Sequence, residues 1–487
     1  MTYLSGVSRQ QKMLLPDSVE DYVGPENPAR VVDAFVEGLD LSALGFGLKS
    51  AGGPGAPAYD PKALLKLYLY GYLNRIRSSR ELEKATRRNL EVIWLLGQLT
   101  PDHWTINAFR RQHRARFKAV FRQFNLLCGN LGLFGKELVA IDGTILKAVN
   151  NPQRNFTRER VAKMLEEIDR RTNEYLEALE TADREASAQS MEGKSGEPRP
   201  SDLRGKLASM EKKREACKAL LEAMEVSPTG QVSLTDPDSR LLEKRTERAV
   251  GYNAQIAVDA ANHLIVAEEV TQEANDSQLL IPMASAAKAA LGVPELKAVA
   301  DTGYYGHDKI RECIEQGIEA YVPMAKRPPA GDGLYPIASF RYDSERDLYV
   351  CPQGKELTRH SDTSRSSGLY HTYYAGVAAC RECPVRQHCT RGKYRKLNVH
   401  EAQELIDAHH ARMRQQPEIQ RKRGALVEHV FGTLKFWLGY RSFLTRGLEM
   451  VRAEFSLSCL AYNFRRALNV AGVATLLAAL QKSTVAA

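Results

Sequence analysis

The spacing of apolar residues changes along the chain from a helical period to a strand period. Between residues 25 and 118 apolar side chains recur every three or four positions, which predicts a series of short amphipathic helices separated by turns. One helix begins at Asp60-Pro61, and another runs from Thr105 to Lys118 with Thr105 as its N-cap. We therefore expect the chain to open with an all-α domain.

The last of these helices is strongly basic. It carries Arg110, Arg111 and Arg114 among its cations, while Phe109 and Phe117 are expected to anchor its other side. Short helices joined by turns resemble a helix-turn-helix region. The three arginines are therefore candidates for DNA contact, and a plain solvated face is the alternative.

Two distant stretches have the strand pattern and stop at an aspartate. The apolar run 138–141 precedes Asp142-Gly-Thr, and the run 296–300 precedes Asp301-Thr-Gly. A short apolar run bounded by Gly is typical of a buried strand. Each strand is expected to place a carboxylate at its end.

Further elements between these two strands complete a mixed α/β pattern. Strands are predicted at 251–259 and 263–270, and a helix at 276–290. Before them lies a long polar helical tract, 157–188 and 201–225, broken by a Gly/Pro/Ser-rich turn. This tract predicts an antiparallel helical hairpin inserted into a sheet domain, which serves either as a solvent-exposed spacer or as a DNA arm.

A third acid lies in a basic segment with helical spacing. Arg421, Glu428 and Lys435 are seven residues apart, so they are expected to share one helix face. Asp142, Asp301 and Glu428 are hard oxygen ligands of the type that Mg²⁺ or Mn²⁺ accepts. Two strand-end aspartates, a helical glutamate and flanking cations indicate a two-metal phosphoryl-transfer site that acts on nucleic acid. Trp437, just after Lys435, is expected to pack in the core rather than to stack on a base.

Charge and length limit the class of protein only loosely. The 487 residues predict two to four domains. The net charge of +9 permits a polyanionic partner, although 59 acidic residues accompany 68 basic ones. The N-terminal residues lack the pattern of a signal peptide, and the longest apolar stretch, near 470–480, is too short for a membrane span. We expect a cytoplasmic protein with no membrane contact.

Four of the eight cysteines fall within forty residues: Cys351, Cys380, Cys383 and Cys389. Such clustering in a cytosolic protein favours a metal over disulfides, and tetrahedral Zn²⁺ is the expected occupant. A predicted hairpin over 340–350 leads into the first cysteine. The pattern indicates a small insertion resembling a zinc ribbon, and reduced structural cysteines without metal are the alternative.

Several of these motifs resemble one family, the DDE transposases of bacterial insertion sequences, and within it the group numbered eleven-eighty-two. The resemblance covers most of the chain and rests on Asp60-Pro61, Leu69-Tyr-Gly-Tyr72, Asp142-Gly-Thr, Gly251-Tyr-Asn-Ala-Gln255, Ala300-Asp-Thr-Gly-Tyr-Tyr305 and Val427-Glu-His-Val-Phe-Gly-Thr-Leu-Lys435.

One signature of the wider superfamily is only partly kept. Glu428 and Lys435 match its glutamate and lysine, whereas Arg421 stands in the tyrosine place and Gly424 in the arginine place. Arg421 or Arg423 would then replace the missing arginine in phosphate contact.

The resemblance implies a ribonuclease H-like catalytic core that uses Asp142, Asp301 and Glu428 as metal ligands. Such an enzyme cuts double-stranded DNA at terminal inverted repeats and joins the ends to target DNA, with Lys435 holding a phosphate. Two ends must be processed together, so a homodimer on DNA is expected, located at the bacterial nucleoid.

The expected domains follow from these elements. They are an N-terminal helical DNA-binding domain (1–130), a ribonuclease H-like core (131–155 and 230–335), a helical hairpin insertion (156–229), a cysteine-rich zinc-binding insertion (336–398) and a C-terminal part of the core that carries the glutamate helix (399–487).

Two rival functions remain at this stage. Another ribonuclease H-fold nuclease would not need the N-terminal domain, and a catalytically silent DNA-binding regulator would be expected to lose the three acids.

Overall fold

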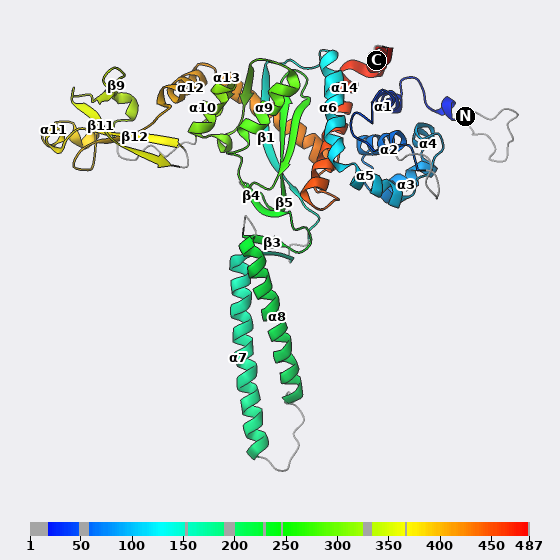
Figure 1. The fold of residues 1–487 in the computed structure, drawn as a ribbon, viewed down its shortest axis with the longest axis horizontal. Coiled ribbons are helices and arrows are strands. Elements are labelled where there is room, and N and C mark those ends of the chain that lie inside the picture. The colour runs from blue at the N-terminus through cyan, green and yellow to red at the C-terminus, as the bar shows by residue number, and fades with distance from the viewer. Residues whose placement is uncertain are drawn as a thin grey trace, which may run out of the picture.

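The computed structural model describes residues 18–47, 58–150, 154–188, 200–226, 230–244, 247–324, 334–365 and 368–485. The molecule has the outline of a T (Figure 1). The crossbar holds the N-terminal helices at one end, the largest sheet in the middle and a smaller sheet at the other end. The stem is a helical hairpin.

The N-terminal part is helical, as the sequence predicts. Its elements are η1 (Val19–Tyr22), α1 (Pro28–Glu37), α2 (Pro61–Leu73), α3 (Ser79–Arg88), α4 (Leu90–Leu95) and α5 (His103–Gln112). Asp60 caps α2 because its side chain accepts a hydrogen bond from the Lys62 N–H at 2.8 Å. The predicted start of this helix at Asp60-Pro61 is confirmed.

The helix predicted from Thr105 to Lys118 is not continuous. α5 begins at His103, where Asp102 and not Thr105 is the N-cap, and it ends at Gln112. The short 3-10 helix η2 (Arg114–Arg116) then leads into α6 (Phe117–Asn130). His113 has a non-helical backbone, and its buried ring stacks on Phe46. This packing is made between residues far apart in the chain, so the helical period of 105–118 does not reveal the break.

The central sheet has the order β4-β5-β1-β7-β8, and β6 also pairs with β5. Its strands are β1 (Leu138–Lys147), β4 (Arg240–Lys244), β5 (Glu247–Asp259), β6 (Ile265–Thr271), β7 (Leu296–Val299) and β8 (Ile318–Tyr321). β4, β6 and β1 run antiparallel to β5, whereas β1, β7 and β8 run parallel to one another. The prediction of an α/β fold with a mixed sheet is confirmed.

Helices cover this sheet and connect it to the N-terminal part. They include α9 (Leu280–Leu291), α10 (His307–Glu315), α12 (Gln403–Gln415), α13 (Pro417–Gly432) and α14 (Leu448–Val485), which is kinked at Gly472. α14 packs on β6 and α6 and also on α1 and α2. The Phe464 ring of α14 stacks on Phe124 of α6, with ring centroids 3.9 Å apart. The N-terminal helices and the sheet therefore share one hydrophobic core.

The smaller sheet is antiparallel and has a core of its own. Its order is β13-β12-β11-β10-β9. The strands are β9 (Arg341–Asp343), β10 (Leu348–Val350), β11 (Glu356–Arg365), β12 (Gly368–Tyr374) and β13 (Lys396–His400), with the short helices η5 (Ile337–Ser339), α11 (Val377–Arg381) and η6 (Arg386–His388). β9 and β10 form the hairpin that was predicted over 340–350.

The stem consists of α7 (Arg158–Ala188) and α8 (Pro200–Val226), which pack along each other (Figure 1). The short pair β2 (Asn155–Thr157) and β3 (Gln231–Ser233) joins its base to the rest of the chain. The two predicted helices are confirmed, and most of the turn predicted between them lies outside the described residues. None of the helices in the described ranges is both long and apolar enough to cross a membrane.

Candidate active site and nucleic-acid interface

The sheet register places the two predicted aspartates side by side. Ala140 of β1 pairs with Val299 of β7 in a parallel ladder, so Asp142 and Asp301 each come two residues after a paired position. β7 ends before Asp301, as predicted. β1 does not end at Asp142 but continues to Lys147, because it remains paired with β5 after β7 has ended. Asp142 therefore lies in the middle of a strand.

Asp142 is largely buried and is bonded to a cation. Its Oδ1 accepts a hydrogen bond from the Gly143 N–H, and its Oδ2 forms a 2.8 Å ion pair with Nη1 of Arg423. Burial raises the pKa of Asp142, Arg423 opposes this shift, and the charge of Asp301 adds to it. The two aspartates are therefore close enough to repel each other.

Asp301 begins the 3-10 helix η4 (Thr302–Tyr304). Its Oδ1 accepts a hydrogen bond from the Gly303 N–H at 2.8 Å, which fixes the carboxylate at the start of this turn. A side chain at Gly303 would come within 3.0 Å of that oxygen. Glycine at position 303, two residues after the aspartate, thus leaves room around the carboxylate.

Helix α13 spans the ends of these strands and carries Glu428. It is anchored by Gln420, which donates a hydrogen bond to the Ala300 carbonyl, and by the ion pair of Arg423 with Asp142. Glu428 is exposed, and a Cβ at Gly424 would lie 3.3 Å from its Oε1. The glycine in the arginine place of the superfamily signature therefore gives the glutamate room.

The shared face predicted for Arg421, Glu428 and Lys435 is not maintained. α13 ends at Gly432, and Lys435 lies in the π-helix η7 (Thr433–Trp437). A π-helical turn has more residues than an α-helical turn, so the seven-residue spacing no longer aligns Lys435 with Glu428. Trp437 is 41% exposed, so the expectation that it packs in the core is wrong.

A buried polar network under the aspartates was missed by the sequence interpretation. The Gln255 side-chain amide donates to Asp276 Oδ1 at 2.8 Å, and its oxygen accepts a 2.5 Å hydrogen bond from the Tyr304 hydroxyl. Lys244 and Asn253 also donate to Asp276. The available signal was two polar residues, Asn253 and Gln255, on one side of the strand within the otherwise apolar run 249–258.

This network connects the two aspartates mechanically. Gln255 pairs with Gly143 across the β1–β5 ladder, and a Cβ at Gly143 would lie 1.9 Å from the Gln255 side-chain nitrogen. Glycine at 143 therefore leaves room for the Gln255 side chain to cross β1 beside Asp142 and to bond with Tyr304. Tyr304 is the last residue of the 3-10 turn that Asp301 caps. The Gln255–Tyr304 hydrogen bond therefore fixes the Asp301 turn against the strand that holds Asp142.

The three acids do not fit a metal ion as they are placed. Within the described ranges, no three His, Cys, Asp or Glu side chains are positioned to hold one ion. Asp142 already has a cation, Arg423, on one oxygen. Asp142 and Asp301 lie together, but Glu428, on the neighbouring helix, does not form a three-ligand metal site with them in the described geometry.

The four clustered cysteines line one small cavity of about 30 Å³ in the smaller sheet domain. All four are free thiols, and the Lys355 N–H donates to Sγ of Cys351 at 3.3 Å. Burial raises the pKa of Cys389, and the other three thiols add to that shift. The predicted cysteines are thus brought together, although not closely enough to form a metal site in the described geometry.

The predicted DNA-contacting arginines of the N-terminal part have different environments. Arg111 and Arg114 are exposed. Arg110 is only 7% exposed, because its guanidinium packs over the Tyr68 ring at 5.8 Å and donates to Asn107. Arg110 belongs to the interior and does not fit the predicted cationic face.

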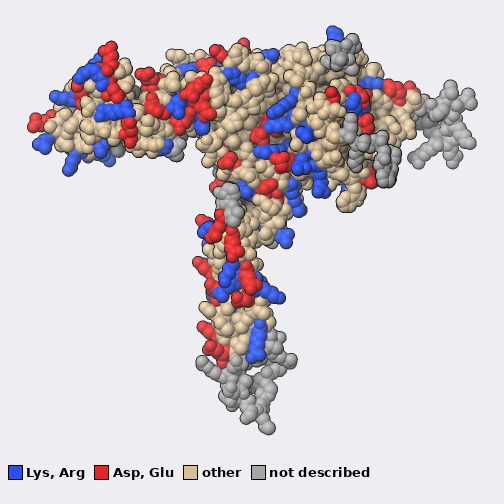
Figure 2. All heavy atoms as spheres, in the orientation of Figure 1, with Lys and Arg blue, Asp and Glu red and all other residues tan. Residues whose placement is uncertain are grey.

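Figure 2 shows Lys and Arg side chains gathered between the central sheet and the N-terminal helices, whereas both signs of charge alternate along the hairpin.

Two family models match the chain. One, described as a transposase DDE domain, matches residues 350–468. The other, described as a transposase domain (DUF772), matches residues 17–112. The two models indicate a DDE transposase of the insertion-sequence type. No curated protein and no solved structure gave a match.

The two matched ranges cover different parts of the transposase. The first contains Glu428, Lys435 and the four clustered cysteines, and the second contains most of the N-terminal helices. Asp142 and Asp301 lie outside both ranges. Their assignment to the site therefore depends on the sheet register and on their proximity.

Proposed function

We propose that this transposase cleaves the ends of an insertion sequence of the eleven-eighty-two group and joins them to target DNA, with Asp142, Asp301 and Glu428 as its catalytic acids. The observation that carries the proposal is the pairing of β1 with β7, which sets two aspartates side by side. The strand order supports a ribonuclease H-like core, because three antiparallel strands are followed by two strands parallel to the first.

Mg²⁺ or Mn²⁺ is the proposed cofactor, since carboxylates are its preferred ligands and it stabilises charge on phosphoryl oxygens. These acids can bind a metal ion only after a rearrangement, because the Arg423 guanidinium forms an ion pair with the Asp142 carboxylate. Arg423 is the natural group to move, since DNA phosphates offer it an alternative anion. Arg111, Arg114, Arg421, Arg423 and Lys435 are the proposed DNA contacts.

A cleavage assay tests the function. The substrate is plasmid DNA that carries the gene with its native flanks, incubated with purified transposase and Mg²⁺. We expect strand breaks at both flanks of the gene, and none when EDTA replaces Mg²⁺. Breaks that are random in position, or no breaks at all, would refute the proposal. The same reaction would show whether two ends are cut together, as expected for the proposed homodimer.

Structural Zn²⁺ at Cys351, Cys380, Cys383 and Cys389 is a separate proposal, supported by their common cavity. Binding would draw the thiolates together and order the smaller sheet, because metal binding and folding are coupled. Elemental analysis of the purified protein is expected to find about one zinc per chain, as for other four-ligand structural sites. Cys383→Ser should lose this zinc, whereas Cys313→Ser, in a buried position of α10, should keep it. A folded wild-type protein free of zinc would disprove this site.

A further inference from the structure

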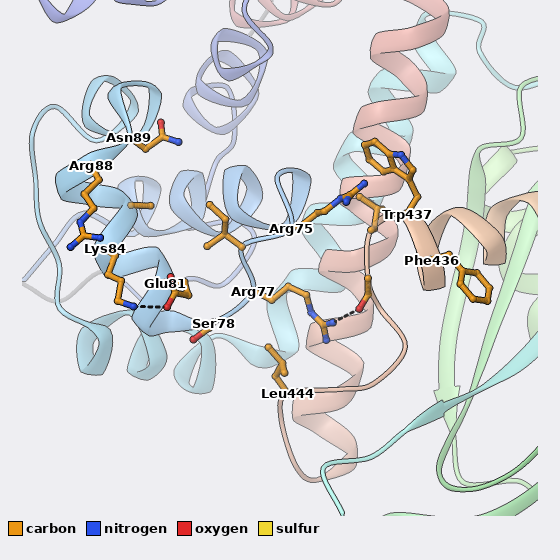
Figure 3. A pocket seen from close by; sticks show the side chains of 14 residues that line it. Arg75, Arg77, Ser78, Glu81, Lys84, Arg88, Asn89, Phe436, Trp437 and Leu444 are labelled. Carbon is orange, nitrogen blue, oxygen red and sulfur yellow. Dashed lines mark hydrogen bonds and ion pairs between the residues drawn. The ribbon is translucent and has the colours of Figure 1, made fainter.

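A groove of about 760 Å³ lies between the N-terminal helices and the segment that follows α13 (Figure 3). One wall is formed by residues 75–89 and the other by residues 436–444. Arg75, Lys84 and Arg88 line the first wall, and all three are exposed. Among these three, and counting only the residues that the structure describes, Lys84 alone has an ion-pair partner, Glu81 at 2.7 Å. The groove is therefore positively charged.

Trp437 on the other wall brings Arg75 together with one more cation, Arg465. The Arg75 guanidinium lies 4.2 Å from the centre of its ring, and that of Arg465, from α14, lies 3.2 Å away. Burial and the charge of Arg75 both lower the pKa of Arg465. The two guanidinium groups thus repel each other through a shared aromatic ring, and within the described ranges neither forms an ion pair with a carboxylate.

Another arginine–tryptophan stack in the same protein is neutralised. Arg30 lies 5.0 Å from the centre of the Trp94 ring, and Glu20 bonds both to Arg30 and to the indole N–H. A stack that only supports the fold can thus be balanced by an acid from the chain. In the part of the chain that the structure describes, no such acid pairs with the two arginines at Trp437, so an anion from outside the chain would relieve their repulsion.

The backbone gives a second, independent indication. Arg75 has φ +66, a left-handed conformation, directly after the C-cap of α2, where the Ile76 N–H bonds to the Gly71 carbonyl at 2.7 Å. Glycine is strongly favoured at such a position, and an arginine adds backbone strain there. Trp437 stands on the π-helix η7, a type of turn found frequently at functional sites. Both partners of the stack therefore occupy unusual backbone positions.

We propose that Arg75 and Arg465, held by Trp437, bind the phosphate backbone of the DNA strand that the transposase processes, with Arg88 extending the contact along the groove. This inference rests on the proposed function and adds an interaction surface to it. The groove adjoins the π-helix that follows the Glu428 helix, so DNA lying in it also meets Lys435. DNA bound in this groove would contact both the N-terminal helices and the segment that follows the Glu428 helix.

The test measures the affinity for a labelled DNA duplex of arbitrary sequence over a series of salt concentrations. Arg75→Gly is the first variant, because it removes the guanidinium and suits the left-handed backbone, so the fold should not suffer. The slope of log affinity against log salt should fall by about one for Arg75→Gly and by about two when Arg465→Gln is added. At moderate salt the double variant should bind roughly tenfold to a hundredfold more weakly.

Two controls make the result specific. Arg75→Lys with Arg465→Lys keeps both charges and should retain most of the salt slope. Arg346→Gln removes an exposed arginine that is paired with Glu356 in the smaller sheet, and it should leave the slope unchanged. A wild-type slope in the folded Arg75→Gly and double variants would overturn the inference and leave the proposed function intact. A wild-type protein that binds no DNA would instead refute the proposed function itself.

Discussion

At the scale of single residues, Arg423 forms an ion pair with Asp142, so we expect it to compete with a metal ion for that carboxylate. Arg423→Gln should tighten Mn²⁺ binding, measured by calorimetry without DNA at a pH where Asp142 is ionised. Arg423 lowers the pKa of Asp142, so its loss raises that pKa further and Asp142 becomes protonated at a higher pH. When the pH is lowered, the variant should therefore lose Mn²⁺ binding at a higher pH than the wild type does. Arg421→Gln, two residues earlier and exposed, is the control. Weaker Mn²⁺ binding by Arg423→Gln at high pH would contradict this role.

Tyr304 acts at the same scale as a positioning residue. Tyr304→Phe removes the hydrogen bond to Gln255 and leaves a buried acceptor unpaired, which costs about 1 to 3 kcal/mol of stability. If the bond also fixes the Asp301 turn, kcat for DNA cleavage should fall at least about tenfold while the affinity for DNA stays constant. Tyr252 lies in the same strand as Gln255 and donates a hydrogen bond to Asp236, so Tyr252→Phe is the matched control and should lower stability only. Equal effects of both variants on kcat would mean that Tyr304 is merely structural.

At the scale of elements, the local spacing of apolar residues predicted whether a segment is a helix or a strand better than it predicted where the helix breaks or which way its side chains face. The apolar runs 138–141 and 296–300 reflect burial of neighbouring strand positions, whereas the hairpin tract shows helical spacing in a mostly exposed segment, and all of these elements are found. The break at His113 and the π-helix at Lys435 result from packing against distant segments, so local spacing could not reveal them. The burial of Arg110 has the same origin, because it depends on Tyr68 of another helix.

The exposed end of α5 and the 3-10 helix η2 that follows it carry the DNA-contact prediction for the N-terminal part. Arg111→Glu with Arg114→Glu should weaken binding to end DNA and reduce the salt slope by about two, because both side chains face solvent. Arg110 is excluded from this test, since a charge reversal there would place a carboxylate in the interior and destabilise the fold. Arg381→Glu with Arg386→Glu, on short helices of the smaller sheet domain, gives a matched change of charge. Equal loss of affinity in both double variants would indicate a nonspecific effect of charge.

At the scale of the whole molecule, the continuous core limits what the parts can do separately. α14 packs both on the sheet and on the N-terminal helices, so the orientation of these helices relative to the three acids is fixed by buried contacts. The sequence predicted the order of segments but not this shared core, because α14 contacts elements hundreds of residues earlier. The hairpin, by contrast, packs mainly on itself and has a small core of its own.

The assignment of Asp142, Asp301 and Glu428 as the catalytic acids is tested most directly by comparing cleavage and binding in the same samples. Asp142→Ala, Asp301→Ala and Glu428→Ala should each reduce cleavage of end DNA in Mg²⁺ below detection and leave the affinity for that DNA within about threefold of the wild type, because phosphate contacts elsewhere supply the affinity. Asp308→Ala, on α10, should cleave normally. Cleavage at the wild-type rate by any one of the three variants would contradict the account and remove that residue from the site.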